Sequence, residues 1–187
     1  MNNKVLIIGA GLFGCCTAIE LAKSGIDVTL VEKNNDIMLE ASKCNHNRIH
    51  FGFHYPRSVE TARESLDGLI LFLMRFKDSI LSDFPNYYFI EKNNSKVTSE
   101  QYLDFCNKVG IDYDLEWPEE YLVKMGDISS SLKVLEPIFD YKVIKNEIKR
   151  QLLNLNVDLK TSYNFTGDVE GYDKVINATY GNINKVN

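Results

Sequence analysis

Three kinds of feature are scarce in this 187-residue sequence, and each absence excludes a class of protein. No apolar run approaches the roughly 18 residues of a transmembrane helix, so no membrane span is expected. Acidic residues outnumber basic ones, 26 to 21, and the net charge of -5 leaves no basic footprint for nucleic acid or an anionic membrane. The four cysteines show no paired spacing, which argues against a disulfide framework and predicts a cytoplasmic location. The remaining composition is that of a globular protein with one sizeable core or two small ones.

The stretch from Val5 to Glu32 has the pattern of a dinucleotide-binding βαβ unit. The apolar run Val5–Ile8 suits a strand buried on both faces. A glycine-rich turn follows it, then a helix-like run to Lys23, and a second apolar strand leads to Glu32. This context is what makes a glycine motif informative, because the glycine spacing alone is common.

Each glycine of the turn has an expected task. Gly9 allows the tight turn, Gly11 lets the backbone approach a pyrophosphate, and Gly14 lets the helix pack close to the strand. A pyrophosphate would lie at the helix N-terminus, where free amides and the helix dipole favour an anion. The residues expected to contact the cofactor in this turn are Gly9, Ala10, Gly11, Leu12, Phe13 and Gly14.

Glu32 ends the second strand, where a carboxylate can accept hydrogen bonds from a ribose diol. It would repel a 2′-phosphate, which argues against NADP. One alternative is a βαβ unit whose glycines serve packing only. Another is a lipoprotein signal, because Lys4 and an apolar run precede Cys15. The bulky Phe13 and the unbroken pattern as far as Glu32 argue against that signal.

Residues 33–57 combine a polar loop with an alternating segment. Residues 33–47 read as a loop that could wrap a cofactor, in which Asn45 and Asn47 are either amide partners or simple turn residues. Residues 48–57 alternate and predict a strand. Its apolar face would carry Ile49, Phe51, Phe53 and Tyr55, and its polar face Arg48, His50, Gly52 and His54.

Gly52 suits the close approach of a flat group such as an isoalloxazine ring. The four-residue spacing of His46, His50 and His54 raises a metal site as an alternative, but no Cys, Asp or Glu nearby completes a ligand set, so no metal is predicted. The plainest alternative is a half-exposed strand with polar residues on one face.

The rest of the sequence predicts an inserted domain, followed by a segment that belongs to the first domain again. Ser58 caps a helix from Val59 to about Ile80, and Thr98 with Gln101 forms a capping box. The inner side of the first helix is expected to carry Leu66, Leu69, Ile70, Leu73, Met74 and Phe76. A helix after Asp140 and two short strands follow, and the second of these strands ends in small residues. Small residues there suit a second close approach to a diphosphate or flavin, or else a plain exit from the strand.

With these residues in view, the chain resembles the FAD-dependent oxidoreductases of the D-amino acid oxidase type, which include glycine, sarcosine and 2-hydroxyglutarate oxidases. The resemblance rests on residues 5–14 with Glu32 and Lys33, on residues 47–55, and on residues 175–179. It departs from the family at Tyr180, which separates Ala-Thr from Gly181. The chain is also shorter than family members, which continue into the rest of a substrate domain, and so it is expected to be a fragment or a truncated product.

The resemblance implies a fold, a cofactor and a set of roles. The fold is α/β, a Rossmann-like FAD-binding domain with a small inserted α+β substrate domain, divided as 1–84 and 138–187 for the former and 85–137 for the latter. The cofactor is FAD, and the activity is oxidation of a small amine, amino acid or 2-hydroxy acid by hydride transfer to the flavin. The implied cofactor contacts, besides the glycine turn, are Glu32, Lys33, Asn47, Arg48, Ala178 and Thr179.

His50 is the candidate catalytic residue, as a polar partner of the ring or substrate that could accept a proton. Arg57 either pairs with a substrate carboxylate or lies on the surface. Two other functions stay open: an NAD-dependent dehydrogenase, and a dinucleotide-binding fragment without a complete active site. A small-molecule substrate is expected, and the oligomeric state is not predicted.

Overall fold

The computed structural model describes residues 3–119 and 126–181, and it divides the chain into two compact units. Unit 1 comprises Met1–Asn45 and Tyr141–Asn187, and unit 2 comprises His46–Asp140. Unit 2 is therefore inserted into the sequence of unit 1. None of the helices in the described ranges has the length and apolar composition that crossing a membrane requires.

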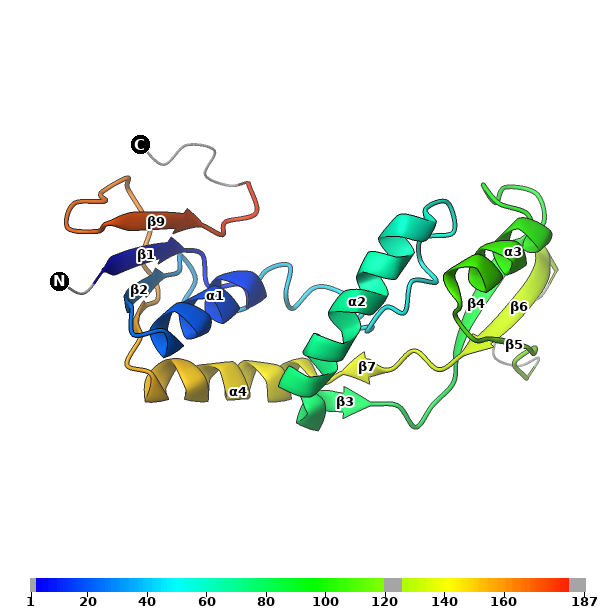
Figure 1. Cartoon of the computed structure of the whole chain (residues 1–187), viewed down its shortest axis with the longest axis horizontal. Coiled ribbons are helices and arrows are strands. Elements are labelled where there is room, and N and C mark those ends of the chain that lie inside the picture. Colours follow the sequence, from blue (N-terminus) through cyan, green and yellow to red (C-terminus); the bar gives the residue numbers. More distant parts are fainter. Residues whose placement is uncertain (1–2, 120–125, 182–187) are drawn as a thin grey trace. The chain divides into compact units, whose positions relative to one another are not determined.

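Unit 1 contains a parallel sheet with its first strand in the interior (Figure 1). The strands are β1 (Lys4–Ile8), β2 (Asp27–Val31), β8 (Asp158–Lys160) and β9 (Lys174–Asn177), in the order β8-β2-β1-β9. The predicted strands in these regions are confirmed. Their order places the topological reversal of the sheet between β1 and β9, and ligands of open parallel sheets bind at the carboxyl ends of the strands at such a point.

Two helices of unit 1, α1 (Leu12–Lys23) and α4 (Tyr141–Asn154), pack against each other. The face that α1 buries carries small residues, including Gly14, Cys15 and Ala18. The buried residues of α4 recur at helical spacing, as expected, and they are Ile144, Ile148 and Leu152. Small side chains on α1 allow close packing, which brings the glycine turn at its start near the sheet.

Unit 2 combines helices with two small antiparallel sheets. A three-stranded sheet has the order β4-β6-β5, and a separate pair joins β3 and β7. The elements in chain order are α2 (Val59–Arg75), the 3-10 turn η1 (Lys77–Ser79), β3 (Ile80–Leu81), β4 (Asn86–Glu91), α3 (Ser99–Val109), β5 (Asp114–Leu115), β6 (Ile128–Val134) and β7 (Ile138–Phe139).

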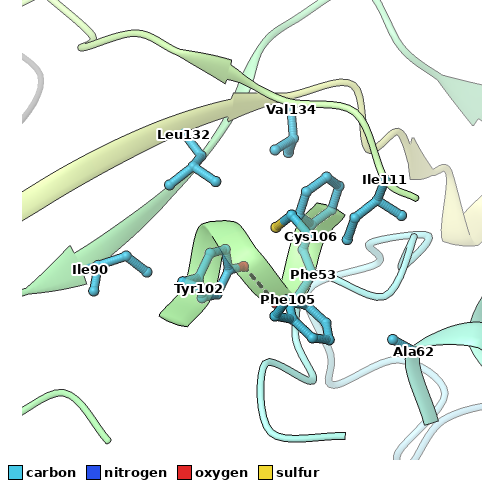
Figure 2. Packing of buried hydrophobic residues seen from close by; sticks show 9 residues of the cluster. All are labelled: Phe53, Ala62, Ile90, Tyr102, Phe105, Cys106, Ile111, Leu132 and Val134. Carbon is cyan, nitrogen blue, oxygen red and sulfur yellow. Dashed lines mark hydrogen bonds between the residues drawn. The ribbon is translucent and has the colours of Figure 1, made fainter. Parts of the chain in front are cut away.

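The core of unit 2 forms where α3 meets the three-stranded sheet and the segment before α2 (Figure 2). The Tyr102 hydroxyl donates to the Phe53 carbonyl oxygen at 2.6 Å, so α3 is attached to that segment by a buried hydrogen bond. The capping box of Thr98 and Gln101 is confirmed, and Gly110 ends the helix in a left-handed conformation. The nine buried residues of this core are Phe53, Ala62, Ile90, Tyr102, Phe105, Cys106, Ile111, Leu132 and Val134.

The strand predicted for residues 48–57 is wrong. Arg48 makes one antiparallel bridge with Ile138, and the chain then turns, with the Tyr55 amide donating to the Gly52 carbonyl oxygen. Gly52 has φ +101, and a Cβ on it would lie 3.0 Å from the Cβ of Ala62. The close approach of α2 and a positive φ therefore explain this glycine, so it is no sign of a flat ligand.

The helix predicted to reach about Ile80 ends earlier, at Arg75, and a 3-10 turn follows. Ser58 is its N-cap, as expected, and accepts a hydrogen bond from the Thr61 amide. Ile70 and Met74 were expected on its inner side, but they are 63% and 73% exposed. The buried face of α2 is centred on Ala62, and both residues lie on its flank.

The predicted division into 1–84, 85–137 and 138–187 differs from the compact units at its first boundary. Residues 46–84 are grouped with unit 2, because α2 packs against α3 and Phe53 belongs to the unit 2 core. The second boundary differs by a few residues only. Which of residues 46–84 serve the cofactor and which the substrate stays a prediction.

Candidate functional site

The glycine turn connects β1 to α1 in unit 1. Gly9 has φ +101, and its amide donates to the Val31 carbonyl oxygen at 2.8 Å, which joins the turn to β2. A Cβ on Gly9 would lie 2.7 Å from the Ala178 carbonyl oxygen, and one on Gly14 would overlap the Gly9 carbonyl oxygen. Packing within the chain therefore requires both of these glycines.

Gly11 is different, because nothing within the described residues requires it to be glycine. Its φ is -69, which any residue adopts, and the only heavy atom found near an added Cβ is the Ser42 hydroxyl oxygen, at 3.5 Å, an ordinary contact. A side chain at this position would instead fill the space in front of α1. The structure thus leaves an uncovered backbone where a dinucleotide motif places its pyrophosphate.

The N-terminus of α1 suits an anion. The Leu12 amide donates to the Ser42 hydroxyl at 2.9 Å, and the first intrahelical bond runs from the Cys15 amide to the Gly11 carbonyl oxygen. The first turn carries no acidic residue, so the positive end of the helix dipole is not neutralised there. Sequence reasoning missed Ser42, whose place at this helix end depends on the path of the loop after β2.

Glu32 lies against the glycine turn and is only 7% exposed. One carboxylate oxygen accepts from the Ala10 amide at 2.8 Å, and the other accepts from the backbone and side-chain amides of Asn34, both at 2.9 Å. With two lone pairs on each oxygen, the oxygen that accepts from the Ala10 amide keeps one lone pair free. The carboxylate is held in place by amide donors and can still accept a hydroxyl group, which is what a ribose diol needs.

The other predicted cofactor residues of unit 1 lie in differing surroundings. The Ala178 amide donates to the Ile8 carbonyl oxygen at 2.8 Å, which sets the end of β9 beside the glycine turn. The amide and hydroxyl of Thr179 both donate to the Asn177 side chain. Lys33 is exposed and pairs with Glu40 at 3.2 Å. Phe13 is 85% exposed.

Asn47, Arg48 and His50, the other predicted site residues, belong to unit 2. Asn47 has φ +53, and its carbonyl oxygen accepts from the Phe139 amide. The Arg48 guanidinium donates to Glu136 at 2.8 Å and lies 4.6 Å from the centre of the Tyr88 ring. Arg48 is therefore engaged within unit 2, and its predicted contact with the cofactor stays a prediction.

Glu136 is the centre of this second group and was missed by sequence reasoning. It is 1% exposed and accepts from the Phe51 amide at 2.6 Å, the Tyr88 hydroxyl at 2.8 Å and Arg48. Burial, followed by the charge of Glu136, raises the pKa of Tyr88, so this hydroxyl remains a donor. In the sequence, an acid between Leu135 and Pro137 looks like an ordinary loop residue.

His50 lies beside Glu136, with its Nδ1 3.9 Å from a carboxylate oxygen and its side chain 35% exposed. Its ring centre is 5.3 Å from that of His54. Burial lowers the pKa of His50, Glu136 opposes this effect, and the charges of His54 and Arg48 add to it. Within the described ranges, no three His, Cys, Asp or Glu side chains are grouped to hold a metal ion. Arg57 is exposed.

Comparison with curated proteins finds relatives that are about twice as long. A FAD-dependent monooxygenase of Fusarium mangiferae is 27% identical over 182 residues, which cover 94% of this chain and 49% of that protein. A glycerol 3-phosphate oxidase of Mycoplasma pneumoniae is 41% identical over 72 residues, which cover 38% of this chain and 19% of that protein. The chain thus spans about half the length of the first of these relatives.

Solved structures show the same fold. The glycine oxidase of Geobacillus kaustophilus matches with a TM-score of 0.72 at 13% identity, over 95% of this chain and 55% of that one. The FAD-bound L-alpha-glycerophosphate oxidase of Mycoplasma pneumoniae matches with a TM-score of 0.71 at 23% identity, over 91% and 48%. The model of the FAD dependent oxidoreductase family matches residues 4–153. The expected family and its cofactor, FAD, are therefore confirmed: the chain belongs to the FAD-dependent oxidoreductases of the D-amino acid oxidase type.

Proposed function

We propose that unit 1 binds the ADP half of FAD at the glycine turn, with Glu32 accepting hydrogen bonds from the ribose. Gly11 carries this proposal, because neither its backbone conformation nor its neighbours require glycine. The uncovered backbone and the α1 amides suit the pyrophosphate, and the end of β9 at Ala178 borders the same turn. Lys33 and Thr179 are further candidates for contacts.

We further propose that the complete protein oxidises a small amine, amino acid or hydroxy acid. Structural neighbours include oxidases of glycine and of L-alpha-glycerophosphate, and these substrates share an oxidisable carbon that carries nitrogen or oxygen. FAD, when bound, accepts a hydride from that carbon. The hydroxyl or amine proton must leave at the same stage. Because the chain spans about half of its longer relatives, this activity is assigned to the complete protein.

His50 is our candidate acceptor for that proton. Burial lowers its pKa from an ordinary value near neutrality, so the imidazole is neutral at pH 7 and can take a proton. Its ring is 35% exposed, which leaves one edge open to a substrate. An exposed arginine such as Arg57 could pair with a substrate carboxylate.

A titration of the 187-residue chain with FAD, FMN, NAD and NADP tests the cofactor proposal. We expect FAD to bind and ADP to compete with it, because both carry the diphosphate and the ribose that the turn and Glu32 recognise. NADP should not bind, because its 2′-phosphate would meet the Glu32 carboxylate. Preference for NAD over FAD would instead support a nicotinamide-dependent dehydrogenase, and binding of none of these ligands would contradict the proposal.

The substitution Gly11→Ala tests whether Gly11 is needed for ligand binding or for packing within the chain. The added methyl group meets only Ser42 within the chain, so the free energy of unfolding should change by no more than about 1 kcal/mol. The affinity for FAD should fall by about 10-fold or more, because the pyrophosphate can no longer reach the backbone. Calorimetric titration and urea unfolding measure the two effects.

Gly68→Ala is the matched control for this substitution. Gly68 lies in α2 of unit 2, and a Cβ there meets nothing within 4 Å. The control should leave FAD affinity unchanged. Unaltered affinity in Gly11→Ala would show that the turn does not hold the pyrophosphate.

A further inference from the structure

We propose that Glu136 is a positioning residue for His50: its buried carboxylate holds residues 48–51 in place and keeps the imidazole proton on Nδ1, so that Nε2 is the atom that accepts a proton. This inference rests on the role proposed above for His50. It adds a residue that lies 86 positions away in the chain and that no sequence motif marks.

Glu136 holds the His50 segment from both sides. The Arg48 guanidinium and the Phe51 amide, which flank His50 in the chain, both donate to its carboxylate, at 2.8 and 2.6 Å. A third donor, the Tyr88 hydroxyl, comes from β4 at 2.8 Å. Three donors on a carboxylate that is 0% exposed leave it little freedom to move. Glu136 is therefore one of the groups that fix residues 48–51, together with Ser65, whose hydroxyl donates to the His50 carbonyl oxygen at 3.0 Å.

The backbone next to Glu136 is fixed as well. The Ile49 amide donates to the Pro137 carbonyl oxygen at 2.9 Å, and the Asn86 side chain donates to the carbonyl oxygen of Glu136 itself. Both the carboxylate and the segment that it holds are thus attached to the same short connection between β6 and β7.

The orientation of His50 points to one tautomer. Its Nδ1 is buried, lacks a hydrogen-bond partner in the described structure and lies 3.9 Å from the Glu136 carboxylate. A carboxylate in that place favours a proton on Nδ1, because an unprotonated nitrogen would set a lone pair against a negative charge. The distance exceeds a hydrogen bond, so the interaction is electrostatic here.

The ionisable groups that face His50 are one acid, one arginine and two further histidines. Glu136 favours the protonated imidazole, whereas His54, Arg48 and His46 disfavour it, and burial disfavours it more than any of these charges. Arg48 in turn neutralises part of the Glu136 charge. The net result is a neutral imidazole. The carboxylate affects which ring nitrogen carries the proton more than it affects the charge of the ring.

The tautomer can be measured without any substitution. Long-range 1H–15N correlation spectra of the 187-residue chain distinguish the two ring nitrogens of a neutral histidine, and the chain has only three histidines. Replacing His46 or His54 by Gln assigns the signals. We expect His50 to carry its proton on Nδ1. A His50 that carries it on Nε2 would overturn the proposal, and because no flavin is needed, failure of FAD binding would leave this result interpretable.

Glu136→Gln tests whether the charge is responsible. The side chain keeps its volume and can still accept from the Phe51 amide, but it loses the charge that favours protonated His50. The titration midpoint of His50 should therefore move to lower pH, and the preference for the Nδ1 tautomer should weaken. Glu136→Asp, which keeps the charge, should restore both properties in part. An unchanged midpoint and tautomer in a folded Glu136→Gln chain would show that Glu136 acts only in packing.

Glu116→Gln is the control for a change in net charge. Glu116 is partly exposed and pairs with Lys133 in the same unit. The Glu116→Gln variant should keep the titration midpoint and the tautomer of His50. An equal shift in Glu116→Gln and Glu136→Gln would contradict a specific effect of Glu136. If Glu136→Gln fails to fold because Arg48 is left unpaired, the tautomer of the unsubstituted chain decides the question.

Discussion

Glycine is needed at different positions of this protein for different physical reasons. Gly9, Gly14 and Gly52 are required by close contacts with neighbouring backbone or side chains, and two of the three have a positive φ. Gly11 has neither reason. The same residue type in one motif therefore serves packing at two positions and, in our proposal, a ligand at the third.

Gly14→Ala should destabilise unit 1. The new Cβ would overlap the Gly9 carbonyl oxygen and lie 3.3 Å from the Ala178 Cβ, so that α1 must shift away from the sheet. Overpacking of this kind costs about 1–3 kcal/mol, which exceeds the gain in helix propensity. Urea unfolding followed by circular dichroism measures the loss. A Gly14→Ala chain as stable as Gly68→Ala would show that α1 adjusts without strain.

At the scale of elements, local signals in the sequence define helix starts well, although they did not predict the end of α2 at Arg75. The capping box at Thr98 and the N-cap at Ser58 both lie where they were expected. These features depend on residues three or four positions apart, so no tertiary information is needed to find them. The buried face of α2 does depend on such information, and the prediction for Ile70 and Met74 was wrong.

Thr98→Ala should lower the stability of unit 2 by about 1 kcal/mol, because the Gln101 amide at the start of α3 loses its acceptor. Thr98→Ser keeps the oxygen and should change stability by only a few tenths of that amount. Urea denaturation of the two variants provides the comparison. If both lose the same stability, packing of the threonine methyl group accounts for the loss instead of the cap.

At the scale of the whole molecule, unit 1 is built from two segments separated by the 46–140 insertion. Contacts between the loop after β2 and α4 connect these segments. Asp36 pairs with Lys145 at 2.9 Å and Lys149 at 2.7 Å, and the Tyr141 hydroxyl donates to the Met38 carbonyl oxygen at 2.6 Å. These contacts join the two segments of unit 1 that flank the insertion.

The Asp36 network should make unit 1 sensitive to acid. Burial alone would raise the pKa of Asp36, but hydrogen bonds from Lys149 and Lys145 outweigh it and lower the pKa to about 2. A lowered pKa stabilises the folded state above the unfolded pKa near 4, and this stabilisation disappears as the pH falls towards 2. Because Asp36 is 31% exposed, solvent screening limits the effect to about 1 kcal/mol.

Comparing the chain with Asp36→Asn by urea unfolding between pH 7 and pH 2 measures this contribution. The variant should be less stable at pH 7 and equal to the unsubstituted chain near pH 2. Asp27→Asn, at the exposed start of β2, is the control for the loss of one exposed carboxylate. A constant difference for Asp36→Asn across the range would exclude the ion pairs as its cause.

The sequence alone was sufficient for the βαβ unit, the helix caps, the family and FAD. The apolar periodicity and the glycine spacing reflect interactions between residues that are close in the sequence, and these interactions depend little on the rest of the fold. Alternation failed at residues 48–57, because in the described part of the chain Arg48 pairs with the short β7 through a single bridge, and because Gly52 turns the chain against Ala62.

Only the tertiary structure placed Ser42 at the start of α1 and Glu136 among Arg48, Phe51 and Tyr88. A buried carboxylate and a surface carboxylate look the same in a sequence, and they differ only in the donors that folding brings to them. Those donors come from segments dozens of residues apart, so the periodicity of the sequence does not predict which of them will contact the carboxylate. The physical reason is that local patterns encode local geometry, whereas burial and charge pairing arise when distant segments pack.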